Sequence, residues 1–127
     1  MKRIGLVLVL LVLFSAMASA APLKVALLIN GALGDRSFFD SAYDGVVAAE
    51  KELGINFKLV EMGYDQSVWD PTLADIAEQD YDVIILGTWQ MTESLEEIAP
   101  WNPDKKFIIF DTSVDYSKGN LDNVYSI

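Results

Sequence analysis

Six residues of this 127-residue chain carry side chains that could bind a small molecule: Asn30, Asp35, Phe38, Trp89, Gln90 and Asp111. They lie at or shortly after the ends of three apolar runs, VALLI, VIILG and FIIF. An aromatic ring can stack on a flat ligand, an amide both donates and accepts hydrogen bonds, and a carboxylate makes strong hydrogen bonds to hydroxyl groups. Together these residue types favour a flat, neutral, hydroxylated ligand.

Each of these residues also has a purely structural interpretation. Phe38 can belong to the core at a helix start, and Trp89 can pack against neighbouring apolar groups. Asp35 can hold its loop in shape, and Asp111 can serve as a turn or cap residue. Asn30 can form a turn with the glycine that follows it. The elements that position these residues therefore matter for their interpretation.

The apolar runs predict the strands of a parallel sheet. Residues 25–29, 83–87 and 107–110 are apolar on both faces, which is typical of central strands. Residues 55–62 alternate in part between apolar and polar side chains, which predicts a half-exposed edge strand. Residues 123–127 are expected to begin another strand.

Helical patterns separate these strands. Ser37 is predicted to cap the first helix, with Asp40 at capping-box spacing. Asp70 is predicted to cap a second helix, and Thr92 a short third one. The apolar stripe expected on the first helix is Phe39, Ala42, Val46, Ala49 and Leu53.

The alternation of strands and helices predicts an α/β fold with a doubly wound parallel sheet, right-handed connections and the strand order 2-1-3-4-5. Ligands bind at the carboxyl edge of such a sheet. The loops 30–38, 87–91 and 111–116 meet at that edge. The six candidate residues, together with Asp115, are therefore expected to border one crevice.

The first twenty residues have the pattern of a secretory signal peptide. Met1-Lys2-Arg3 is followed by an apolar run from Leu6 to Phe14 and by Ala18-Ser19-Ala20, an A-x-A cleavage pattern. An uncleaved membrane anchor is the alternative, but the apolar run is well short of the roughly 20 residues that span a bilayer. We expect cleavage after Ala20, and the length of the chain corresponds to one domain or less.

Charge and composition exclude several classes of function. The net charge is −10, and it becomes more negative when Lys2 and Arg3 are removed with the leader, so binding of nucleic acid or anionic lipid is not expected. The sequence has no histidine and no cysteine, which excludes imidazole and thiolate catalysis. No metal or cofactor is expected. Without the cysteine that carries a lipid anchor, the exported protein is expected to be soluble, in a periplasm or outside the cell.

The ordered set of segments resembles the basic membrane protein family. The matching segments are KVALLINGALGDRSFFDSAYDGVVAAEKELGI, YDVIILGTWQM, PDKKFIIFD and NVYSI. That family consists of type I periplasmic binding proteins and includes purine nucleoside receptors of ABC importers. The resemblance covers residues 23–127 and implies the N-terminal part of the first of two ligand-binding lobes. The second lobe is expected to follow in a longer protein.

The resemblance also implies roles for individual residues. Phe38 matches the phenylalanine that stacks on the purine, and Asp111 matches an aspartate near the ribose. Trp89 and Gln90 fall in a pocket-lining loop. Asn30 stands where the family usually has an aspartate that contacts the base, so base preference is expected to differ.

The function implied is that of a periplasmic substrate-binding component of an ABC importer, with a purine nucleoside as ligand and a permease as partner. Its only membrane contact is expected to be through that permease, and no catalysis is implied. A receptor for a free sugar or another small polar solute is the alternative within the same fold. An exported flavodoxin-like enzyme is a further alternative, in which GALGDRS and Arg36 would hold a phosphate. That loop matches neither GxGxxG nor the P-loop pattern.

Overall fold

The computed structural model describes residues 21–127, so the expected signal peptide, residues 1–20, lies outside the described residues. Five strands form one sheet: β1 (Lys24–Ile29), β2 (Asn56–Glu61), β3 (Val83–Gly87), β4 (Lys106–Phe110) and β5 (Val124–Ser126). All neighbouring strands are parallel. Their order is β2-β1-β3-β4-β5, which confirms the predicted α/β fold and the 2-1-3-4-5 arrangement.

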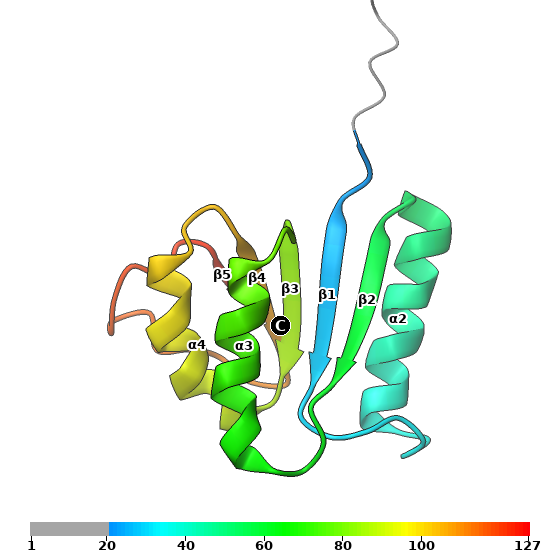
Figure 1. The fold of residues 1–127 in the computed structure, drawn as a ribbon, viewed down its shortest axis with the longest axis horizontal. Coiled ribbons are helices and arrows are strands. Elements are labelled where there is room, and N and C mark those ends of the chain that lie inside the picture. The colour runs from blue at the N-terminus through cyan, green and yellow to red at the C-terminus, as the bar shows by residue number, and fades with distance from the viewer. Residues whose placement is uncertain (1–20) are drawn as a thin grey trace, which may run out of the picture.

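Helices connect the strands (Figure 1). The α-helices are α2 (Phe38–Leu53), α3 (Trp69–Glu78) and α4 (Thr92–Ile98), and the short 3-10 turns are η1 (Gln66–Val68), η2 (Trp89–Met91) and η3 (Ala99–Trp101). α2 joins β1 to β2, whereas α3 and α4 lead into β3 and β4. Along residues 21–127 no helix has both the length and the apolar character needed to cross a membrane.

The two faces of the sheet are covered unequally. On one face, Ala26, Leu28 and other strand residues are fully buried against the apolar sides of α3 and α4. On the other face, Leu27 and Ile29 are buried with Val46 of α2, but Ile85 is only partly buried. A parallel sheet is normally buried on both faces. Within residues 21–127, one face has two helices over it, and the other has α2 alone.

The starts of the helices differ in detail from the sequence predictions. Ser37 occupies the N-cap position of α2, but its side chain makes no capping hydrogen bond. The Asp35 carboxylate accepts the Phe39 N–H instead. Asp70 does not cap α3, because η1 runs directly into a helix that already begins at Trp69.

The contacts of Asp70, the helix position of Thr92 and the exposure of Leu53 also differ from the sequence predictions. The Asp70 carboxylate accepts a hydrogen bond from the Ser94 hydroxyl and so joins α3 to α4. Thr92 is the first residue of α4 rather than its cap. Leu53, predicted to be the last residue of the apolar stripe, is 75% exposed in the final turn of α2.

Candidate ligand-binding site

A polar cluster joins the carboxyl ends of β1 and β3. The Asn30 side-chain amide, Nδ2, donates to Thr88 Oγ1 at 3.1 Å and to Gln90 Oε1 at 3.4 Å. The Thr88 hydroxyl donates to the same Gln90 oxygen at 2.7 Å. The structure thus brings together Asn30 and Gln90, as the sequence predicted. Sequence reasoning missed Thr88, although its place directly after β3 puts it beside the end of β1.

This cluster sets the orientation of the Asn30 amide. Because both hydrogen bonds use Nδ2, the other amide atom, Oδ1, remains as an acceptor. Oδ1 is buried and has no hydrogen-bond partner among the described residues. A buried acceptor without a partner costs free energy. A hydrogen-bond donor placed beside Oδ1 would therefore stabilise the protein.

An aromatic pair lies at the same edge of the sheet. The ring centroids of Phe38 and Phe110 are 5.3 Å apart, and Phe38 also meets Phe39 edge-to-face at 5.3 Å. Gly87 leaves room for the pair, since a Cβ at that position would come within 2.5 Å of the Phe110 ring. Phe110 was not among the predicted site residues. The feature that could have identified Phe110 is its pairing with Gly87 in the neighbouring strand.

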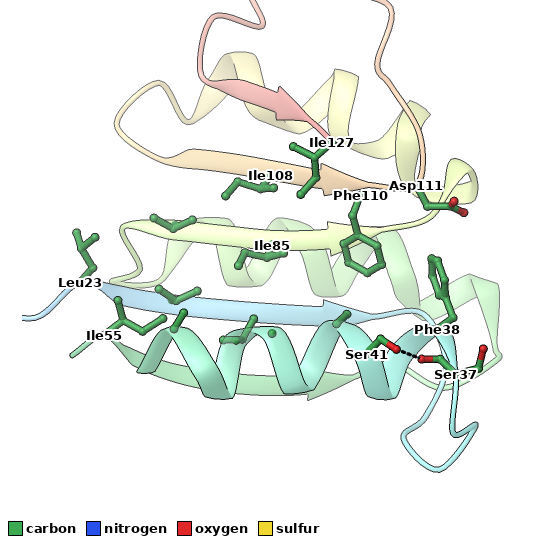
Figure 2. Close-up of a pocket in the computed structure, with 16 residues that line it drawn as sticks. Leu23, Ser37, Phe38, Ser41, Ile55, Ile85, Ile108, Phe110, Asp111 and Ile127 are labelled. Atoms are coloured by element: carbon green, nitrogen blue, oxygen red, sulfur yellow. Dashed lines mark hydrogen bonds between the residues drawn. The ribbon is translucent and has the colours of Figure 1, made fainter. Parts of the chain in front are cut away.

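An apolar groove of about 820 Å³ lies between α2 and the open face of the sheet. Figure 2 shows Phe38, Phe110 and Asp111 at one end of this groove. We call this the α2 groove. Asp111 has a φ of 63°, in the left-handed region that residues other than glycine rarely adopt. Asp111 is exposed and the Phe38 ring is half-buried, so a ligand could contact both at this end of the groove.

Asp35 stabilises the loop before α2. Its carboxylate accepts the backbone N–H groups of Ser37 at 2.9 Å, Phe39 at 3.0 Å and Asp40 at 3.3 Å. These N–H groups hold the pKa of Asp35 below its ordinary value, with the Ser37 bond as the largest cause. The geometry supports the structural interpretation of Asp35, since its oxygens face the backbone that carries Phe38.

Asp35→Ala is expected to destabilise the protein measurably, because it leaves N–H groups at the first turn of α2 without their acceptor. Chemical denaturation measures the loss. Asp44→Ala, at an exposed position further along α2, is the matched control and is expected to change stability by less than about 0.5 kcal/mol. Equal losses in the two variants would contradict a capping role for Asp35.

Trp89 and Asp115 lie in other surroundings than Phe38. Trp89 is 70% exposed and lines a separate cleft of about 460 Å³ with residues of α3 and α4, including Glu93 and Glu97. The Asp115 carboxylate accepts from the Ser117 hydroxyl at 2.7 Å within its own turn. Gln90 lines the Trp89 cleft and also contacts Asn30, so it links that cleft to the polar cluster.

Glu96 of α4 holds the loop that follows Asp111. Its carboxylate accepts the Asp115 N–H and the Lys118 ammonium, each at 2.7 Å. The side chain is only 5% exposed. These contacts, the Asp115 N–H first, hold the pKa of Glu96 below its ordinary value. α4 thus helps to position the loop that follows β4.

Glu96→Gln is expected to reduce the stability of the protein at neutral pH but to have a smaller effect in acid. A carboxyl group whose pKa is lowered by folding adds stability above its unfolded pKa, and this stability is lost as the pH falls through the folded pKa. Melting temperatures of both proteins between about pH 3 and pH 7 measure the effect. A difference between the two curves that did not narrow below about pH 4 would contradict this assignment.

Comparison with known proteins identifies the family. Residues 23–127 match the family model described as ABC transporter substrate-binding protein PnrA-like. An uncharacterised lipoprotein of Pyrococcus furiosus is 38% identical over 76% of this chain, and one of Pyrococcus abyssi is 34% identical over 80% of it. The chain spans about a quarter of the length of these relatives, 25% in each case.

A solved structure shows the same arrangement of strands and helices. An ABC transporter system solute-binding protein from Aeropyrum pernix K1 superposes with a TM-score of 0.75 at 31% identity. The superposition covers 83% of this chain and 28% of that protein. The similarity therefore extends through the described sheet and its helices.

The comparison overturns one expectation from the sequence. The Pyrococcus relatives are named lipoproteins, a class held at a membrane by a covalently attached lipid. The prediction of a soluble, unanchored protein was therefore wrong. It rested on two absences from this sequence, that of cysteine and that of a further apolar segment long enough to span a membrane. The match over residues 23–127, the relatives and the shared fold agree on the assignment: this chain belongs to the family of PnrA-like ABC transporter substrate-binding proteins.

Proposed function

We propose that the full-length protein binds a purine nucleoside and delivers it to the permease of an ABC importer. Family membership supports the class of function. The observation that carries the ligand proposal is the half-buried Phe38 ring at the carboxyl edge of the sheet, where Asp111 lies beside it. A base can stack on such a ring, and vicinal ribose hydroxyls can donate to a carboxylate.

Asn30 supports a particular polarity of hydrogen bonding. Thr88 and Gln90 occupy Nδ2, so Oδ1 is left to accept a hydrogen bond. A ligand that binds Oδ1 must therefore supply a hydrogen-bond donor, such as an N–H group of a base. Because Oδ1 is buried, the side chains that cover it must move before the ligand can reach it. An aspartate at this position has no donor, so the Gln90 amide and the Thr88 hydroxyl would have to reorient to donate to it. We infer that Asn30, Thr88 and Gln90 act as a matched set.

Residues 21–127 form the N-terminal part of the first ligand-binding lobe in this proposal, and residues 1–20 act as the signal peptide. A second lobe, in the part of the protein that this chain does not span, supplies the opposite wall of the site. The two lobes close on the ligand by a hinge, as periplasmic binding proteins do. No step requires a catalytic residue or a cofactor.

A thermal-shift screen of the full-length protein tests the proposal. A purine nucleoside at about 100 times its Kd is expected to add about 2.7 kcal/mol of stability, because it binds only the folded state. Free purine bases, pyrimidine nucleosides and pentoses serve as the comparison set. The screen therefore separates recognition of the base from recognition of the sugar.

Stabilisation by a pentose or another free sugar, with none by any nucleoside, would favour the alternative ligand class and contradict the nucleoside proposal. The same hydrogen-bonding groups, Asn30, Gln90 and Asp111, could serve a sugar. Turnover of the nucleoside into other products would contradict the transport assignment itself. Product analysis by chromatography after prolonged incubation detects such turnover.

A further inference from the structure

We propose that Phe110 is a positioning residue of the ligand site: it holds the ring of Phe38 in place from the neighbouring strand, and Gly87 leaves the space that Phe110 occupies. The ring centroids of Phe38 and Phe110 lie 5.3 Å apart, with an angle of 44° between the ring planes (Figure 2). The inference rests on the proposed function, in which Phe38 stacks on the ligand. It adds a residue that acts on the ligand through Phe38.

Phe38 depends on neighbouring rings because it is not part of the core cluster on the α2 side of the sheet. Phe39 and Phe110 both pack against that cluster, whereas Phe38 does not belong to it. The half-buried Phe38 ring contacts Phe39 edge-to-face and Phe110 in a tilted arrangement. A side chain at a helix start can adopt several staggered rotamers. The two neighbouring rings therefore favour one orientation of Phe38.

Both supporting rings lie directly over a glycine of the sheet edge. A Cβ at Gly87, the last residue of β3, would come within 2.5 Å of Cε2 and Cζ of Phe110. A Cβ at Gly31, shortly after β1, would come within 2.4 Å of Cε2 of Phe39. Real Cβ atoms do not approach other atoms so closely, so a side chain at either position would displace the ring above it. Phe38 is thus supported by two rings that rest on the backbone of the sheet.

Support of this kind affects affinity through preorganisation. A side chain that becomes ordered only when the ligand arrives weakens binding, because its loss of freedom opposes association. Tilted and edge-to-face aromatic pairs at about 4.5–7 Å are favourable beyond their buried area, by roughly two- to tenfold in an equilibrium constant. Loss of Phe110 is therefore expected to weaken binding through Phe38, and by less than the loss of Phe38 itself.

A double-mutant cycle in the full-length protein tests this role, with inosine as the probe and calorimetry as the measurement. Phe110→Ala is expected to weaken inosine binding by about three- to tenfold in the native background. In the Phe38→Ala background it is expected to change binding by less than about twofold, because the ring that it supports is gone. Gly87→Ala is expected to weaken binding as well, since its methyl group displaces the Phe110 ring.

Ile108→Ala is the matched control, because Ile108 lies two residues before Phe110 in β4 and lines the same groove. It is expected to leave inosine affinity within about twofold of the native value. Phe110→Leu keeps most of the apolar volume and replaces Phe110→Ala if that variant does not fold, with the same expected direction. Equal losses from the Phe110 substitution in both backgrounds would overturn the proposal, since Phe110 would then act without Phe38.

Fluorine NMR of the ligand-free protein, labelled with 4-fluorophenylalanine, separates this proposal from the nucleoside proposal. The signal that Phe38→Ala removes belongs to Phe38. Phe110→Ala is expected to shift or broaden that signal, and Ile108→Ala is expected to leave it unchanged. An unchanged Phe38 signal in Phe110→Ala would overturn the positioning role whichever ligand binds. A changed signal in a protein that binds no nucleoside would support the positioning role and contradict only the proposed ligand.

Discussion

Phe38→Ala is expected to weaken binding of a purine nucleoside to the full-length protein by one to two decades, which corresponds to roughly 1–3 kcal/mol. The substitution removes the ring that lies half-buried at the carboxyl edge of the sheet, against Phe110. Base–aromatic stacking contributes about this much for each base. Isothermal titration calorimetry of both proteins with the same nucleoside measures the change.

Phe38→Tyr is the matched variant for this experiment, because it keeps an aromatic face at the same position. It is expected to bind within about threefold of the native protein, since stacking tolerates changes of the ring. Phe38 also contacts Phe39 and Phe110, so the folded state of each variant must be checked by denaturation. A folded Phe38→Ala protein with unchanged affinity would exclude Phe38 as the stacking residue.

Ile109→Ala is expected to cost residues 21–127 about 2–5 kcal/mol of stability, whereas Ile108→Ala is expected to cost less than half of that loss. The two positions carry the same side chain and are adjacent in β4. Ile109 is fully buried under α3 and α4, and removal of its methyl groups leaves a cavity. Ile108 is partly exposed at the α2 groove, so solvent can fill the space it leaves.

Urea denaturation of the two variants compares the losses directly, provided that the slope of the transition stays constant. Equal costs in residues 21–127 would contradict the unequal coverage of the sheet. The pair therefore tests the unequal burial of the two faces of the sheet.

The sequence by itself determined the sheet. Continuous apolar runs at β1, β3 and β4 and a half-alternating run at β2 define which strands are central and which lies at the edge. Because the chain alternates strands with helices and crossovers are right-handed, few arrangements remain, and 2-1-3-4-5 is among them. Side-chain periodicity is a local property, which is why the pattern alone was sufficient for this level of structure.

Helix starts and the roles of single site residues were not decided by local pattern. Both Ser37 and Asp35 stand before α2 and both can cap a helix, but the loop geometry turns the Asp35 carboxylate toward the N–H groups. Asp70 has a good cap sequence, yet its carboxylate pairs with Ser94, which lies on another helix. In the first case two neighbouring side chains competed for the same N–H groups, and in the second a distant partner replaced the local one.

Only the tertiary structure decided which side chains meet at the carboxyl edge. It joined Asn30 to Thr88 and Gln90 across two strands, paired Phe38 with Phe110, and left Trp89 in another cleft. It also showed that one face of the sheet remains open beside α2. These features depend on strand register and on the volumes of side chains far apart in the chain. A hydrophobic pattern records which residues are apolar, but it does not record which of them an incomplete layer leaves uncovered.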